Sequence, residues 1–89
     1  MTGADLPGRH WTEAGELHID VRGLRPPEPM VAILGQIDGA IQRDRITVHH
    51  DREPVYLYPE LATRGWVHRI IEGEEVEKGE VRLILTRKP

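Results

Sequence analysis

The sequence predicts an α/β fold, a two-layer α/β sandwich in the order β-α-β-α-β-β, with a four-stranded mixed sheet and two helices on one face. Three observations lead to this prediction. The 89 residues suit a single domain, apolar and polar side chains alternate in several short segments, and two segments with helical features lie between them. A right-handed crossover would make the first two strands parallel, and the last two would form an antiparallel hairpin.

Alternation of apolar and polar side chains marks the strands. Leu17, Ile19 and Val21 alternate with polar neighbours, and Gly23 ends this first strand. Strands are expected over residues 16–22, 45–50, 66–72 and 81–86. The pattern leaves the inward face of residues 66–72 open. If the apolar side chains of the first two strands face the helices, the open face carries His18, Asp20, Arg22, Thr47 and His49.

Proline-rich segments precede both predicted helices. The first helix is expected over residues 27–42, because prolines suit a first helical turn and the apolar residues that follow fall on one face. These apolar residues are Met30, Ile33, Leu34, Ile37 and Ile41. Gly35 and Gly39 would each weaken the helix by about 1 kcal/mol. The second helix becomes regular after Tyr58 and ends at Gly65.

The chain divides into an arm and a domain. Residues 1–15 lack periodicity and predict a flexible N-terminal arm, in which Trp11 is the largest apolar side chain, and residues 16–89 form the domain. Residues 72–80 hold five Glu and one Lys. This acidic segment is interpreted as a solvated hairpin loop, and a docking site for a basic partner is the alternative.

Composition excludes several functions. The absence of cysteine excludes disulfides, thiolate metal sites and thiol nucleophiles. The net charge of −3 argues against nucleic acid as a partner; a basic patch on the open face would revive that possibility, formed by Arg22, Arg45, Arg69 and Arg82. No apolar run is long enough to span a membrane and no secretory signal is present, so we expect a cytoplasmic protein without a membrane partner.

Residues 20–30 (DVRGLRPPEPM) resemble the TusA/SirA-like sulfur-carrier family, which has a strand, a Gly-Leu turn and a Cys-Pro-x-Pro motif at the start of its first helix. The resemblance covers roughly residues 16–87 and implies the same fold. Pro27 and Pro29 match the motif prolines, whereas Pro26 stands where the carriers have the cysteine that holds sulfur as a persulfide. Because proline has no thiol, the resemblance implies the fold without the sulfur-transfer activity.

A closer resemblance is to an uncharacterised bacterial domain family related to these carriers. Residues 26–29 (PPEP) carry it, together with residues 50–54 (HDREP) followed by Leu57, Pro59 and Leu61. Members of that family occur alone, in tandem or beside other domains, including hemerythrin-like ones. The resemblance implies no established activity.

The two resembling segments also define the candidate binding site. The carboxyl ends of two parallel strands meet at one edge of a sheet, where ligands bind in open α/β folds. The predicted binding residues are Arg25, Pro26, Pro27, Glu28, His50, Asp51, Arg52 and Glu53. Two arginines and two helix starts suggest an anion or carboxylate. The alternative is structural, with the acids as helix caps and the arginines as their ion-pair partners.

A metal site is the second hypothesis. Adjacent strand residues point to opposite faces, so His49 and His50 cannot easily share one ion, whereas His50 could do so with Asp51 and His68. The five histidines also offer pH sensing. Our expectation is that no metal and no cofactor are bound.

Together these patterns predict a non-catalytic binding or regulatory domain that is not an enzyme, with a protein partner or a small acidic ligand. A metal- or redox-linked accessory domain is the alternative. A small enzyme using the same residues ranks last, because no nucleophile motif or phosphate loop is present.

Overall fold

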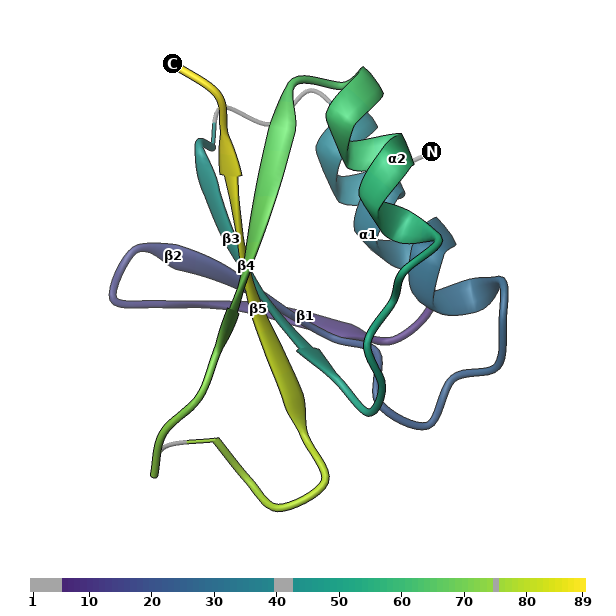
Figure 1. Ribbon diagram of the computed structural model, residues 1–89, viewed down its shortest axis with the longest axis vertical. Helices are drawn as coiled ribbons and strands as arrows, with labels where there is room; N and C mark the ends of the chain where they lie inside the picture. Colours follow the sequence, from purple (N-terminus) through teal and green to yellow (C-terminus); the bar gives the residue numbers. More distant parts are fainter. Residues whose placement is uncertain (1–5, 40–42, 75) are drawn as a thin grey trace.

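The computed structural model describes residues 6–39, 43–74 and 76–89 (Figure 1). Within them, five strands form one mixed sheet in the order β1-β2-β3-β5-β4. The elements are β1 (Arg9–Glu13), β2 (Glu16–Asp20), α1 (Glu28–Asp38), β3 (Arg45–His50), α2 (Leu57–Thr63), β4 (Trp66–Ile71) and β5 (Val81–Arg87). Figure 1 shows both helices on the same side of the sheet, as the sequence predicts. No helix in the described ranges is long and apolar enough to cross a membrane.

The prediction of a four-stranded sheet is wrong, because Arg9–Glu13 in the presumed arm forms the additional edge strand β1. This strand pairs antiparallel with β2. A two-residue turn joins them, with positive φ at Ala14 (51°) and Gly15 (81°), as tight hairpins require. Because Trp11 is the single apolar side chain of β1, no alternation of apolar and polar residues marks this strand. It is held by backbone pairing with β2, which leaves no pattern in the sequence. Residues 1–5 of the arm lie outside the described residues.

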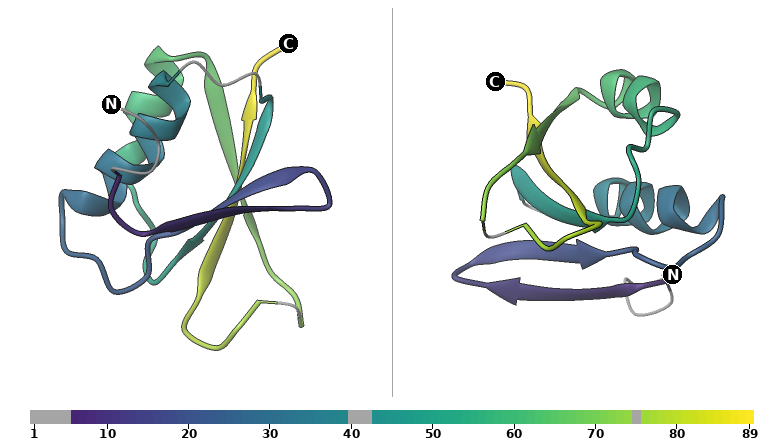
Figure 2. Two further views of the ribbon diagram at one scale, coloured as in Figure 1. Left: turned by 180° about the vertical axis from the view of Figure 1, so that it is seen from behind. Right: turned by 60° about the horizontal axis from the view of Figure 1, so that its bottom comes forward.

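The predicted connections between the other strands are confirmed. β2 and β3 are parallel, with Ile19 opposite Val48, and β4 and β5 are antiparallel. Figure 2 shows the β1–β2 hairpin lying across the direction of the β4–β5 hairpin, so the sheet is strongly twisted.

Both helices differ in extent from the prediction. The first ends at Asp38 rather than residue 42, because Gly39 turns to an extended conformation (ψ 162°) while its N–H still donates to the Gly35 carbonyl. The end of that predicted helix, residues 40–42, lies outside the described residues. The second begins at Leu57, slightly earlier than predicted, and ends at Thr63.

A single apolar core lies between the helices and the sheet. Its buried residues are Leu17, Ile19, Val21, Ala32, Ile33, Ile37, Ile46, Val48, Leu57, Leu61, Trp66, Leu83 and Leu85. The structure also settles the orientation of β4. Trp66 is buried, and His68 pairs with Leu85, so Trp66 and His68 face the helices.

The open face is less solvated than its polar pattern suggests. Thr47, His49 and Ile84 are buried there although neither α1 nor α2 covers them. Glu80, at the end of the acidic segment, is also buried, and its carboxylate accepts hydrogen bonds from Arg82. The acidic segment is therefore anchored to the sheet at this end.

Candidate functional site

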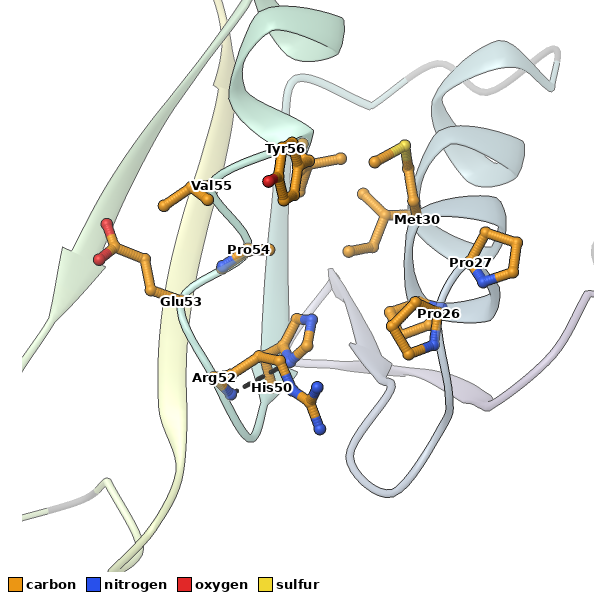
Figure 3. Close-up of a pocket in the computed structure, with 12 residues that line it drawn as sticks. Pro26, Pro27, Met30, His50, Arg52, Glu53, Pro54, Val55 and Tyr56 are labelled. Carbon is orange, nitrogen blue, oxygen red and sulfur yellow. Dashed lines mark hydrogen bonds between the residues drawn. The ribbon is translucent and has the colours of Figure 1, made fainter.

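A pocket of about 440 Å³ opens between the start of α1 and the segment that joins β3 to α2 (Figure 3). Its volume lies in the range of small-molecule sites. The lining residues are Pro26, Pro27, Pro29, Met30, Ile33, His50, Arg52, Glu53, Pro54, Val55, Tyr56 and Leu57. Most of these side chains are apolar, so the pocket suits an apolar group.

The structure brings together five of the eight predicted binding residues. These five, which line the pocket, are Pro26, Pro27, His50, Arg52 and Glu53. Arg25 and Glu28 are exposed and outside the lining. Asp51 is also outside it and has a structural role, because its carboxylate accepts a 2.9 Å hydrogen bond from the Gly23 N–H. Asp51 thus ties the loop after β2 to the loop after β3.

His50 is the buried polar group of the pocket. Its Nδ1 lies 2.9 Å from the Asp51 backbone nitrogen and 3.3 Å from that of Arg52. A backbone N–H can only donate, so Nδ1 accepts and the ring proton of the neutral imidazole is on Nε2. The Asp51 carboxylate oxygen 3.3 Å from Nδ1 is then a close neighbour rather than a hydrogen-bond partner.

The Nε2–H of His50 is directed into the pocket (Figure 3). It has no hydrogen-bond partner among the described residues. Among the described residues, every fully buried side-chain nitrogen or oxygen has a hydrogen-bond partner. Nε2 of His50 has none, so it is not fully buried and must reach solvent through the pocket. Burial lowers the pKa of His50, and the opposing effect of Asp51 is smaller. At neutral pH the pocket therefore contains an N–H donor that no group of the described residues uses.

Backbone amides contribute little to this site, contrary to what two converging helix starts suggest. The N–H groups of Glu28 and Leu57 donate to the carbonyls of Arg25 and Pro54, and Pro29 has no N–H. These groups therefore do not form an anion-binding site of free backbone N–H groups at the helix starts. Polar recognition falls to the side chains of His50 and Arg52.

Charged and aromatic side chains form one edge of the pocket. Arg52 is 60% exposed at its side chain, and its Nε donates to Asp51 at 3.1 Å. The Tyr58 hydroxyl donates to Glu53 at 3.1 Å, and burial together with this contact raises the pKa of Tyr58 to about 12. Val55 and the ring of Tyr56 are exposed apolar groups of the lining, on side chains of residues that are 52% and 83% accessible.

The predicted metal set of His50, Asp51 and His68 is not assembled. The His68 ring stacks on Tyr58 with a centroid distance of 3.5 Å and does not line the pocket. Within the described residues no three His, Asp or Glu side chains lie where they could hold a metal ion.

The basic patch considered for nucleic acid is largely neutralised. Arg22 pairs with Asp20, and Arg45 pairs with Glu16. Arg82 pairs with Glu80 in the same way. These three of its four cations are therefore already engaged by carboxylates.

Sequence reasoning missed part of the pocket and all of a second cluster. Their spacing predicts Met30 and Ile33 on the buried face of the helix, but their place in the pocket wall depends on how α1 packs. On the open face, Trp11, His18 and His49 stack together. The only signal was that His18 and His49 share that face.

Comparisons with known proteins identify a family. No curated protein and no solved structure matches the chain. A family model described as "Uncharacterized conserved protein (DUF2249)" matches residues 18–87, which include the whole pocket lining. The chain therefore belongs to the DUF2249 family of uncharacterised conserved proteins.

Proposed function

We propose that the chain is a non-catalytic binding domain that holds the apolar part of a carboxylate ligand in the pocket between α1 and residues 50–57. The observation that carries this proposal is the Nε2–H of His50. This donor sits on an otherwise buried ring, faces an apolar pocket and has no partner in the described part of the chain. A buried polar group is normally hydrogen-bonded. A ligand that supplies an acceptor would complete this site.

The charges favour a carboxylate over a neutral acceptor. Arg52 lines the pocket with more than half of its side chain exposed, and charge-assisted hydrogen bonds are about twice as strong as neutral ones. Glu53 opposes an anion, but its carboxylate already accepts from Tyr58. The exposed Val55 and Tyr56 would extend apolar contact beyond the pocket, which suits an acid presented by a protein partner as well as a free small acid.

The lack of a nucleophile supports a non-catalytic role. The polar lining side chains are His50, Arg52, Glu53 and Tyr56, and the chain has no cysteine. On the resemblance to TusA/SirA-like carriers, Pro26 occupies the position of the sulfur-carrying thiol, and it lines this pocket. We infer that the sulfur-carrier fold is used here for binding at the place where the carriers perform sulfur transfer.

A titration series tests this proposal. Nitrogen-15-labelled protein is titrated with short alkyl carboxylates and with alcohols and amines of the same chain length. Carboxylates should shift the resonances of Met30, Val55 and the His50 ring, with alcohols weaker and amines weakest. Shifts confined to other parts of the chain, or none for any compound up to millimolar concentration, would refute the proposal.

Two arginine variants separate charge recognition from general effects. Arg52→Gln should weaken carboxylate binding several-fold and leave alcohol binding unchanged. Arg69→Gln is the matched control, because Arg69 is exposed on β4 and outside the pocket lining. Equal losses in the two variants would show that net charge, and not the pocket, attracts the acid. Carboxylate-ended peptides compared with free acids distinguish a protein partner from a small ligand.

A further inference from the structure

A second constellation of titratable groups lies on the open face, away from the pocket. Nδ1 of His18, on β2, lies 2.9 Å from Nε2 of His49, on β3. Nδ1 of His49 lies 2.7 Å from Oε2 of Glu80. The Trp11 ring stacks on both imidazoles, with centroid distances of 5.3 Å and 5.4 Å. These contacts form a continuous chain from a buried carboxylate to a half-buried imidazole.

The carboxylate end of this chain fixes where the protons are. Arg82 donates to both oxygens of Glu80, at 2.8 and 3.0 Å, and the Glu77 N–H donates at 3.1 Å. Burial favours the protonated acid, but these hydrogen bonds outweigh it and lower the pKa of Glu80 to about 2. Glu80 is therefore an acceptor only, and His49 must carry its proton on Nδ1.

The remaining proton positions follow in sequence. When His49 is neutral, its Nε2 is an acceptor, so Nδ1 of His18 must donate to it. Nε2 of neutral His18 then has a lone pair and no proton. This atom has no hydrogen-bond partner in the part of the chain that the structure describes, and it is not among buried atoms without partners. It consequently faces solvent.

We propose that Glu80, His49 and His18 form a proton relay whose binding site is Nε2 of His18 and whose ligand is a single proton. A new N–H bond forms at Nε2 of His18. The N–H bond at Nδ1 of His18 breaks, and its proton forms an N–H bond at Nε2 of His49. The charge then resides on His49, beside the Glu80 carboxylate, while His18 is neutral in its other tautomer.

The surface consequence is a reversal of hydrogen-bonding character. Before protonation the exposed nitrogen of His18 accepts a hydrogen bond, and afterwards it donates one. The Trp11 ring face adds a favourable environment for a cation on the imidazole pair. Because the two rings lie close together, a second proton on the pair is opposed by the charge of the first.

Neighbouring charges set the pH at which this happens. Burial and the proximity of His49 lower the pKa of His18, and Glu13 and Glu16 oppose that effect. The charged groups around the relay lie on β1, β2, the turn after β2, the loop between β4 and β5, and β5. They are Arg9, Glu13, Glu16, Asp20, Arg22, Glu77, Glu80 and Arg82. Asp20 is paired with Arg9 and Arg22, so these three charges partly offset one another.

Nitrogen-15 correlation spectra of the histidine rings test the relay in the full chain without mutation. At pH 8 both His18 and His49 should show the Nδ1–H tautomer. On acidification His49 should become doubly protonated first, while the proton of His18 moves to Nε2. An Nε2–H tautomer of His18 at pH 8, or initial protonation that leaves the charge on His18, would overturn the proposal.

Two variants give an independent check. Glu80→Gln removes the charge that stabilises the proton on His49, so the shared transition should move to lower pH. His49→Gln interrupts the chain, so His18 should then become the cation itself. His10 on β1 is an internal reference, because no hydrogen bond or ring contact joins it to the relay in the described structure. Unchanged behaviour of His18 in both folded variants would also refute the relay.

Discussion

Glu80→Gln should lower the free energy of unfolding at pH 7 by about 3 kcal/mol. The Glu80 side chain is 1% exposed, and it accepts from Arg82, His49 and a backbone N–H. These contacts lower its pKa from 4.5 to about 2. At about 1.4 kcal/mol per pKa unit, that shift corresponds to about 3 kcal/mol. Gln is a neutral replacement of similar shape, and leaves the half-buried Arg82 without its carboxylate.

The pH dependence makes this prediction specific to the charge. Because the folded pKa is below the unfolded one, the stabilisation is complete above about pH 4.5 and disappears as the pH falls toward 2. Urea unfolding at pH 7, 5 and 3, followed by the fluorescence of buried Trp66, should therefore give curves that converge on acidification. Glu77→Gln is the control. That side chain is 72% exposed and paired with Arg22, so its loss should cost less than about 1 kcal/mol. The reasoning would be refuted if Glu80→Gln lost the same unfolding free energy at pH 7 and pH 3, or lost no more than Glu77→Gln.

Three further predictions concern the core, α1 and the pocket. Leu61→Ala, at a 1% exposed core position, should cost about 2–5 kcal/mol in urea unfolding, whereas Val31→Ala, 48% exposed, should stay within about 0.5 kcal/mol. A Cβ at Gly35 would lie 2.6 Å from Cδ2 of Leu6. The double variant Gly35→Ala/Leu6→Ala should therefore be more stable, by at least about 0.5 kcal/mol, than the sum of the two single losses in unfolding free energy predicts. Single losses that simply add would contradict that contact. Burial lowers the pKa of His50, so the unfolded chain binds the proton first and stability falls as the pH drops below about 6.5. In His50→Gln the melting temperature should change less between pH 7 and pH 5 than it does in the native chain. The same change in both proteins would argue against a desolvated ring.

The parts of the fold that sequence reasoning predicts are those in which burial is periodic. Leu17 and Ile19 alternate with polar residues on β2, and Ile46 and Val48 do so on β3, because one face of each strand packs on the helices. β1 lacks that signal. Its Ala14 and Gly15 turn is not the usual Asn-Gly type, and backbone pairing with β2 carries no pattern in the side chains.

The candidate site was predictable as a location but not as a chemical environment. Parallel strands bring two loops to one edge, so Pro26 and Arg52 could be expected near each other. The tautomer of His50 depends on two backbone N–H groups that meet its ring only after the loop folds. Similarly, Glu80 belongs by composition to a solvated acidic segment, and only the approach of Arg82 and His49 makes its burial possible.

His49 and His50 show how one local rule leads to two different sites. Adjacent strand residues point to opposite faces, so His49 joins the relay on the open face and His50 faces the pocket. Each ring has its Nδ1 held by a fixed partner, but the partners are of opposite kinds. A carboxylate accepts from Nδ1 of His49, and backbone N–H groups donate to Nδ1 of His50. The two neighbours must therefore hold opposite tautomers in the neutral protein. The pocket thereby gains a donor, while His18 at the end of the relay keeps an acceptor on the other face.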